Sequence, residues 1–287
     1  MILVTGATGR VGYRLMEALA DARADATAMV RVEARAEDLP GTPGHVVATL
    51  DKPPAAAVLR AFDRIFLLSP EVPEQAALEI AFIDAVVAAG HRPHIVKACA
   101  YGFHDPDCEV RFMRAHRQVA AHLDAVNLPV TYLAAAPYME NLRDDAAQVR
   151  GTGEIRAAAG HGRAGFIAAA DVAAAAARVL TSDGQDGVTH VLTGPEALSY
   201  AQVAARFGAV FGSRVEYADQ SPERERDRLL YAGRTEWEAD GAIERFAWIP
   251  QGGAAIVTDS VRELTGAGPR SLQEWLGESR EDFDSLA

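Results

Sequence analysis

The chain has 287 residues, of which 49% are hydrophobic, and its 28 basic and 40 acidic side chains give a net charge of −12. This length suits one large α/β domain with a smaller appendage. The acidic balance would repel a nucleic-acid backbone, so we expect no nucleic-acid partner. Two cysteines, Cys99 and Cys108, make no disulfide framework. No apolar stretch is long enough to span a bilayer, and we expect a cytoplasmic protein with no membrane partner.

The chain opens with a short apolar strand over residues 2–4, a glycine-rich turn, and a helix marked by Val11, Leu15 and Leu19 at helical spacing. Strands and helices then alternate. We predict strands over 27–30, 45–48, 64–68, 94–98 and 130–133, and helices over 55–62, 74–89 and 109–125. Strands alternating with helices predict a doubly wound, parallel Rossmann-type sheet.

The pattern changes after Pro137. We expect Asp171 to cap a helix that ends near residue 180, followed by a strand over 188–192. From Ser199 the pattern is mostly helical, with Gly266 as a helix stop. Three capping boxes are predicted, at Ser199/Gln202, Ser260/Glu263 and Ser271/Glu274. The expected domains are therefore a Rossmann domain over 1–195 and a small, helix-rich lobe over 196–287, the latter with contributions from about 138–165.

Three glycines shape the turn after the first strand, in a GxxGxxG spacing. Gly6 permits a sharp exit from the strand, Gly9 lets the backbone approach a pyrophosphate, and Gly12 lets the helix pack closely. The helix N-terminus offers free amides and a positive dipole to phosphate. A tight turn that binds nothing is the alternative, but the strand before the turn and the helix after it favour a dinucleotide site.

The end of the second strand predicts the choice of cofactor. An NAD enzyme usually places an acid there to accept from the ribose 2′-hydroxyl, whereas this strand is followed by Arg31, with no acid before Glu33. The Arg31 guanidinium can bind a 2′-phosphate, and Arg10 in the turn is a second donor. Each arginine taken alone also fits a solvated surface; together, with no acid, they favour NADP(H).

Several segments of the chain form a recognisable set: Thr5-Gly6-Ala7-Thr8-Gly9, Met29-Val30-Arg31, Phe66-Leu67-Leu68-Ser69-Pro70, Ile95-Val96-Lys97, Pro137-Tyr138-Met139-Glu140-Asn141-Leu142, Leu192-Thr193-Gly194-Pro195-Glu196-Ala197-Leu198, Val257-Thr258-Asp259, Leu264-Thr265-Gly266 and Glu274-Trp275. These segments resemble the NmrA-like family of atypical short-chain dehydrogenases/reductases. They cover nearly the whole chain in order.

The resemblance implies NADP(H) binding by positions spread over four strand ends and one later loop. The matching residues are Gly6, Thr8, Gly9, Arg10, Val11 and Gly12 for the pyrophosphate, Arg31 for the 2′-phosphate, Leu67, Leu68 and Ser69 for the adenosine and the nicotinamide ribose, Lys97, Cys99 and Ala100 under the nicotinamide, and Pro137 and Tyr138 beside nicotinamide and substrate. The family includes quinone reductases, a dye reductase, redox-sensing regulators without turnover, and ketoreductases of antibiotic pathways such as the angucyclinone, simocyclinone-type enzymes.

Short-chain reductases use a Ser-Tyr-Lys triad, in which tyrosine donates the proton that follows hydride. By the resemblance, Cys99, Phe112 and His116 stand at these three positions. Phenylalanine has no proton to donate and a thiol is a weak donor, so the triad is expected to be absent.

His116, Tyr101 and Tyr138 remain as catalytic candidates, beside water or a hydroxyl group on the substrate. His116 also fits a half-buried helix position, and the tyrosines also fit pocket walls. The histidines are too scattered for a metal site, and we expect no metal.

Two functional hypotheses follow. The first is an NADPH-dependent reductase of a ketone or quinone on a bulky aromatic substrate held between the two lobes, in which case an alanine- and arginine-rich, lysine-poor composition favours antibiotic biosynthesis. The alternative is an NADP(H)-binding redox sensor without turnover, which the missing triad favours. Neither the oligomeric state nor the identity of the substrate follows from the sequence.

Overall fold

The computed structural model describes residues 1–41, 43–143, 149 and 151–284. The chain forms two compact units. The first comprises Met1–Cys99, Arg114–Ala134 and Ala169–His190, and the second comprises Ala100–Met113, Ala135–Ala168 and Val191–Ala287. Among the residues described, no helix has both the length and the apolar character needed to cross a bilayer.

A seven-stranded sheet has the order β3-β2-β1-β4-β5-β6-β9. Its strands are β1 (Ile2–Val4), β2 (Ala26–Val30), β3 (Gly44–Val47), β4 (Arg64–Leu67), β5 (His94–Ala100), β6 (Val130–Ala135) and β9 (Thr189–Leu192). The pairs from β3 to β5 are parallel. At the other edge, the amides of Tyr132 and Ala136 donate to the carbonyls of Val188 and Leu192, an even advance along both strands that is the parallel pattern. The predicted doubly wound parallel sheet is confirmed.

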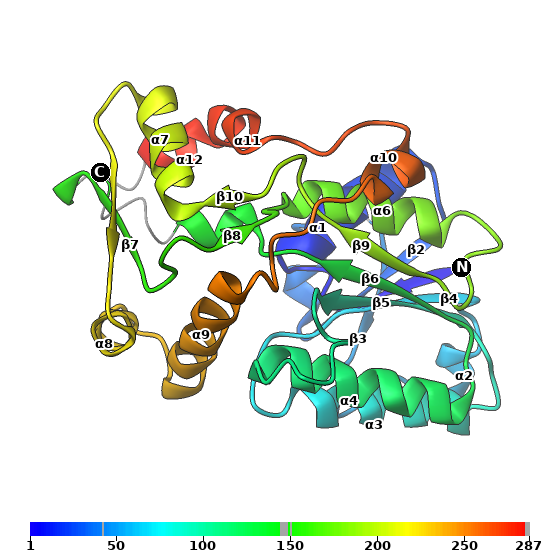
Figure 1. Cartoon of the computed structure of the whole chain (residues 1–287). Coiled ribbons are helices and arrows are strands. Elements are labelled where there is room, and N and C mark those ends of the chain that lie inside the picture. Colours follow the sequence, from blue (N-terminus) through cyan, green and yellow to red (C-terminus); the bar gives the residue numbers. More distant parts are fainter. Residues whose placement is uncertain (42, 144–148, 150, 285–287) are drawn as a thin grey trace. The chain divides into compact units, whose positions relative to one another are not determined.

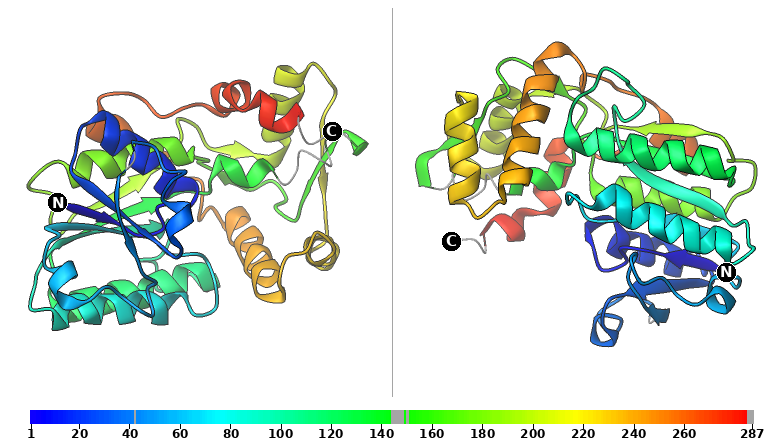
Figure 2. Two further views of the ribbon diagram at one scale, coloured as in Figure 1. Left: turned by 180° about the vertical axis from the view of Figure 1, so that it is seen from behind. Right: turned by 90° about the horizontal axis from the view of Figure 1, so that it is seen from below.

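Helices cover both faces of this sheet (Figure 1). One face carries α1 (Arg10–Asp21) and α6 (Ala169–Leu180), and the other carries α3 (Gln75–Ala88) and α4 (Arg111–Val126). The short elements α2 (Ala56–Leu59) and η1 (Glu33–Arg35) lie in connections. Figure 2, viewed from below, shows α3 and α4 running side by side. Because both faces are covered, the strands β1, β4 and β6 are almost wholly apolar and buried.

The order of the strands fixes where a ligand can bind. The chain starts in the middle of the sheet at β1, moves outward to β2 and β3, and returns to β4 on the other side of β1. The connections after β1 and β4 therefore leave in opposite directions, and in open α/β sheets ligands bind outside the carboxyl ends of strands at such a switch point. The residues that follow these two strands are Thr5–Gly9 and Leu68–Ser69.

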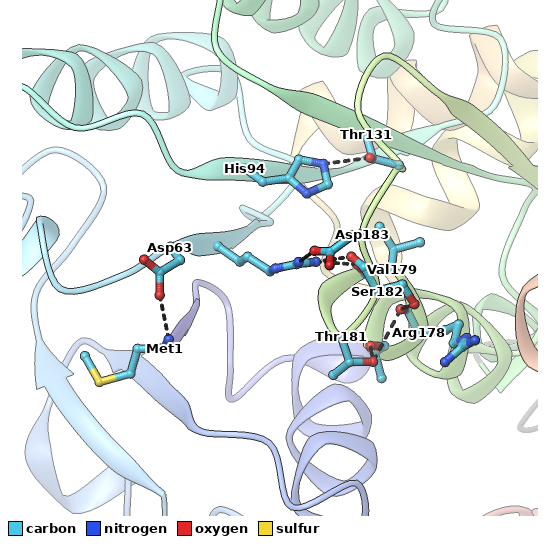
Figure 3. A network of polar contacts seen from close by, with 11 residues as sticks. Met1, Asp63, His94, Thr131, Arg178, Val179, Thr181, Ser182 and Asp183 are labelled. Atoms are coloured by element: carbon cyan, nitrogen blue, oxygen red, sulfur yellow. Dashed lines mark hydrogen bonds and ion pairs between the residues drawn. The ribbon is translucent and has the colours of Figure 1, made fainter.

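A polar network holds the amino ends of the strands, on the side of the sheet opposite to the carboxyl ends (Figure 3). The Arg64 guanidinium at the start of β4 donates to the carbonyls of Val179 and Ser182 at the C-terminal end of α6 and pairs with Asp183. A cation at this end of a helix satisfies carbonyls that have no partner within the helix and complements its dipole. Arg64 thus fixes α6 to the sheet.

The second unit contains two small sheets and most of the C-terminal helices. Its strands are β7 (Glu154–Ala157) paired in parallel with β11 (Glu216–Asp219), and β8 (Arg163–Ala164) paired antiparallel with β10 (Leu198–Ser199). Its helices are η2 (Met139–Leu142), α7 (Tyr200–Phe211), α8 (Pro222–Tyr231), α9 (Glu236–Trp248), η3 (Ile249–Gln251), α10 (Ser260–Thr265), α11 (Leu272–Glu278) and α12 (Arg280–Asp284). Its core combines alanine and aliphatic side chains with aromatic rings, among them Phe166, Tyr200, Phe207, Phe246 and Trp275.

The predicted helix ends are partly correct. The capping boxes at Ser199 and Ser271 are confirmed, and Gly266 takes the left-handed conformation expected of a helix stop. The box at Ser260 is wrong, because Asp259 is the N-cap and Ser260 already lies inside α10. A third box forms instead at Thr235 with Glu238. The prediction for Asp171 is also wrong in position, because α6 begins two residues earlier, at Ala169.

Candidate functional site

The turn after β1 is built around glycine. Gly6 has a φ of +63°, and a Cβ there would lie 3.0 Å from the carbonyl oxygen of Leu68. A Cβ on Gly12 would lie 2.0 Å from the carbonyl oxygen of Gly6, so α1 packs directly on the turn. These contacts agree with the steric roles expected of both residues, because only glycine lets the strand exit and the helix approach so closely.

No side-chain hydrogen bond caps the N-terminus of α1. Its N-cap is Gly9, and the first turn holds no acidic residue. Thr8, Gly9 and Arg10 are exposed, whereas the Val11 side chain is buried, so Val11 has only its backbone to offer a ligand. Uncapped amides and a positive helix dipole suit a phosphate group.

Thr5 ties the ends of β1 and β4 together. Its hydroxyl donates to the carbonyl of Leu68 at 2.8 Å or of Phe66 at 3.1 Å, and it accepts from the Leu68 amide at 2.8 Å. The two strand ends at the switch point therefore form one rigid edge. Sequence reasoning missed this role, although the threonine directly before Gly6 was the available signal.

The edge at the end of β2 is basic, as expected. Arg31 follows the last residue of β2 and is exposed, with no hydrogen bond or ion pair in the described part of the chain. The nearest acid along the chain, Glu33, lies 3.6 Å from a ring nitrogen of His45. An exposed guanidinium without a protein partner is available to an anion.

A serine after the end of β4 is hydrogen-bonded to a buried carboxylate. Leu67 is buried and Leu68 is partly exposed. The Ser69 hydroxyl, only 8% exposed, donates to Oε1 of Glu79 at 2.6 Å. Glu79 lies on α3 and its other oxygen is 3.1 Å from Nζ of Lys97 on β5, with neither of these two side chains exposed at all.

The two predicted residues on β5 with reactive side chains are enclosed. Besides pairing with Glu79, Lys97 donates to the carbonyl of Ala98, so its ammonium group is satisfied within the protein. Burial raises the pKa of the Cys99 thiol to about 12, with a smaller opposing effect from Lys97. Cys99 is therefore a neutral, buried thiol, and Ala100 ends the strand.

His116 lies on α4 among the same buried polar groups. It is 5% exposed, and its Nδ1 lies 3.4 Å from the side-chain nitrogen of Gln75. Burial, with a smaller contribution from the positive charge of Lys97, holds the pKa of His116 well below 6.5. The imidazole is therefore neutral at pH 7 and can pass a proton on, but it does not store one.

Tyr101 and Tyr138, the other two candidates, belong to the second unit. Tyr101 directly follows β5 and packs against Trp248, with 6.1 Å between ring centroids. Burial raises the pKa of Tyr101, and the nearby charge of Asp105 adds to this effect. Tyr138 is partly exposed and pairs with Ile167, whose amide donates to the Pro137 carbonyl at 3.0 Å.

Trp248 is a residue that sequence reasoning missed. A Cβ on Gly253 would lie 2.1 Å from its indole ring, and a Cβ on Gly102 would lie 2.9 Å from it. Two glycines thus leave room for this ring, which remains partly exposed beside Tyr101. No periodicity in the sequence connects a tryptophan at the end of α9 with the loop after β5.

Phe112 stands where the resemblance places the tyrosine of the triad. It is buried in the second unit, edge-on to Trp237 with 5.0 Å between ring centroids. Its ring also fills the space in front of Gly241, where a Cβ would lie 2.3 Å away. Phe112 therefore has a packing role in this unit.

Comparison with known proteins identifies the family. The NmrA-like family matches residues 1–232. The chain belongs to this family. The resemblance noted in the sequence is thereby confirmed, and the match extends over the whole of the first unit and much of the second.

Individual relatives span the chain almost from end to end. It is 31% identical over 277 residues to an NAD(P)H azoreductase of Xenophilus azovorans, covering 96% of each chain. It is also 31% identical to a (4-alkanoyl-5-oxo-2,5-dihydrofuran-3-yl)methyl phosphate reductase of Streptomyces griseus, covering 99% of each. A crystal structure of an NADPH-dependent quinone oxidoreductase of Escherichia coli, complexed with NADPH, has a TM-score of 0.88 at 26% identity, covering 97% of this chain and 99% of that one.

Proposed function

We propose that this protein is an NADPH-dependent reductase that transfers hydride to a ketone or quinone carbonyl of a bulky aromatic substrate. The observation that carries the proposal is the glycine turn at the switch point between β1 and β4, with exposed basic residues at its adenosine side. Relatives that align over nearly the whole chain are an NAD(P)H azoreductase and a quinone oxidoreductase, which supports both the cofactor and the reductase activity.

The residues present fit NADPH. Gly6 and Gly12 let the end of β1 and the start of α1 pack closely, Gly9 adds no side chain to the exposed face of the turn, and the uncapped amides of α1 suit the pyrophosphate. Arg31 and Arg10 provide guanidinium groups for a 2′-phosphate. This pair is the reason to prefer NADPH to NADH.

When bound, the nicotinamide would supply hydride to the substrate carbonyl. The chain must then provide a proton to the oxygen that becomes negatively charged. A tyrosine hydroxyl is protonated at neutral pH, and burial raises the pKa of Tyr101 further, so this hydroxyl is available as a proton donor. Tyr138 is the second hydroxyl donor, and neutral His116 can relay a proton without changing its resting charge. Water or a phenolic hydroxyl of the substrate completes the set of candidates.

Tyr101→Phe tests the first candidate, because it removes the hydroxyl and keeps the ring against Trp248. If Tyr101 is the donor, kcat falls by about 100-fold while NADPH affinity stays the same. Tyr138→Phe and His116→Ala make the same comparison at the other two positions. If all three variants keep the wild-type kcat, the proton comes from water or from the substrate.

A narrower form of the proposal is a ketoreductase of antibiotic biosynthesis. The alanine- and arginine-rich composition and a full-length relative from Streptomyces griseus support it. Polyphenolic ketones suit a site without a Ser-Tyr-Lys triad, because a hydroxyl beside the carbonyl polarises it from within the substrate.

The second candidate function is an NADP(H) sensor without turnover. The burial of Phe112 against Trp237 favours it, because the position assigned to the catalytic tyrosine holds a side chain with no proton to give. Incubating the protein with NADPH and a panel of quinones, azo dyes and polycyclic ketones, while following reduced-nicotinamide absorbance, separates the two functions. Oxidation of NADPH with any substrate supports the reductase; tight NADPH binding without turnover on the whole panel supports the sensor.

A further inference from the structure

A buried ion pair lies directly beneath the end of β4. Glu79 and Lys97 are both completely enclosed, and their charged atoms are 3.1 Å apart. Enclosing two charges costs free energy that the attraction between them offsets only in good geometry, and an apolar pair of similar volume is often at least as stable. The pair is therefore poorly explained by stability alone.

One contact leads from this pair towards the surface. The carboxylate oxygen of Glu79 that does not face Lys97, Oε1, accepts a hydrogen bond from the Ser69 hydroxyl at 2.6 Å. An ionised carboxylate only accepts, so this contact fixes the direction of the hydrogen. With its single hydrogen directed at Glu79, the Ser69 oxygen presents only lone pairs in every other direction.

Ser69 lies where the second half of a dinucleotide would cross the sheet. It follows β4, whose end is tied by Thr5 to the turn that begins at Gly6. In a doubly wound sheet, the two nucleotide halves bind on the two sides of this switch point, so the β4 side receives the nicotinamide half. A group there that can only accept would select a sugar hydroxyl as its donor.

We infer that Glu79, held by Lys97, is a positioning residue that orients Ser69 as an acceptor for a ribose hydroxyl in the nicotinamide half of NADPH. This inference rests on the proposed function for the identity of the ligand. The buried pair thus contributes to cofactor binding through Ser69, and neither charged group touches the cofactor itself.

Calorimetric binding tests this inference with two ligands, NADP⁺ and 2′,5′-ADP, the second of which lacks the nicotinamide ribose. Ser69→Ala should weaken NADP⁺ by about fivefold, the usual value of one neutral hydrogen bond, and leave 2′,5′-ADP unchanged. Equal weakening of both ligands would mean that the substitution distorts the turn as a whole, and would overturn the inference. Unchanged NADP⁺ affinity would overturn it as well.

Two double variants isolate the part played by Glu79. Both Glu79→Leu/Lys97→Met and Glu79→Gln/Lys97→Met remove the two charges together, which avoids leaving one charge buried alone. Only the glutamine variant keeps an oxygen that can accept from Ser69. We expect the leucine variant to bind NADP⁺ as weakly as Ser69→Ala, with no further loss when Ser69→Ala is added, and the glutamine variant to stay within about twofold of wild type.

Other results contradict the inference. If the leucine and glutamine variants bind NADP⁺ equally well, the acceptor at position 79 has no role. If the losses from Ser69→Ala and the leucine variant add, the two act separately. These measurements need no turnover, so they remain valid for a sensor; a wild-type protein that fails to bind NADP⁺ would instead overturn the proposed function itself.

Discussion

Alanine substitution at two glycines of the turn separates folding from cofactor binding. At Gly12, a new Cβ would lie 2.0 Å from the Gly6 carbonyl oxygen, 2.7 Å from its carbon and 2.8 Å from Cα of Ala7. All three are backbone atoms, and the shortest distance is about 1.4 Å below the 3.4 Å at which ordinary contact begins. Only a shift of α1 away from the turn can relieve this overlap.

The cost of that shift is large. Overpacking of a well-filled interior usually costs about 1–3 kcal/mol, and backbone neighbours cannot rotate aside, so we expect about 3 kcal/mol or more for Gly12→Ala. Gly9→Ala is the matched control, because Gly9 has a φ of −84° that any residue adopts and its Cβ would lie 3.1 Å from a single carbonyl oxygen. We expect Gly9→Ala to cost well under 1 kcal/mol of unfolding free energy.

Gly12→Ala should therefore lower stability, whereas Gly9→Ala should lower NADPH affinity and leave stability almost unchanged. In thermal unfolding, Gly12→Ala should lower Tm by several degrees while Gly9→Ala stays close to wild type. In calorimetry, Gly9→Ala should weaken NADPH by 10-fold or more, about 1.4 kcal/mol, because its methyl group occupies the path of the pyrophosphate. A Gly12→Ala protein as stable as wild type would refute the packing argument. A stable Gly9→Ala protein with unchanged NADPH affinity would refute the phosphate assignment.

Three further predictions concern single side chains. Arg31→Ala should weaken NADPH by about 10- to 100-fold, the value of a charge-assisted hydrogen bond, and NADH very little; equal weakening of both would remove the 2′-phosphate assignment. His116 is neutral in the folded protein and takes up a proton when the chain unfolds, so the free energy of unfolding should fall as the pH drops below 6.5, by up to about 1.4 kcal/mol per pH unit. Denaturant titrations of His116→Gln should show a smaller fall over the same pH range. If the wild type and the variant lose stability in parallel, the buried neutral imidazole is contradicted. Arg64→Met should lose about 1–3 kcal/mol of stability through its contacts with the end of α6 and leave NADPH affinity unchanged, since it lies at the opposite edge of the sheet; a loss of affinity without a loss of stability would contradict this placement.

The fold was predictable because its signals are local. Each buried strand is a short apolar run and each helix has its own periodicity, so their alternation gives the parallel sheet. The glycine spacing is also a local signal, because it predicts a close approach of the helix to the turn, which is found at Gly12. The Ser260 box was not predictable, because Asp259 and Ser260 are both good N-cap residues and tertiary contacts decide which of them ends the loop.

Short strands with distant partners were missed for a related reason. β7 and β11 are four residues each, and they pair across about sixty positions of chain. Neither has enough length to show a periodic pattern, and only folding brings the two segments together. Their existence depends on non-local contacts that a single sequence does not reveal.

The candidate site shows the same division. The strand-end residues Gly6 and Arg31 were identified from position alone. The Glu79–Lys97 pair was not, although Lys97 is the one Lys, Arg, Asp or Glu side chain in an apolar strand and Glu79 stands between apolar residues, which was a usable signal. That signal does not say which opposite charge is the partner, because α3 and β5 are brought together only by the layering of the sheet.

Calorimetric titration of the wild-type protein with NADPH and with NADH measures whether the glycine turn and Arg31 together form a dinucleotide site. We expect NADPH to bind and NADH to bind more weakly, because the glycine turn receives the pyrophosphate of both but Arg31 meets a 2′-phosphate only in NADPH. Binding of neither nucleotide, or a preference for NADH, would contradict this expectation.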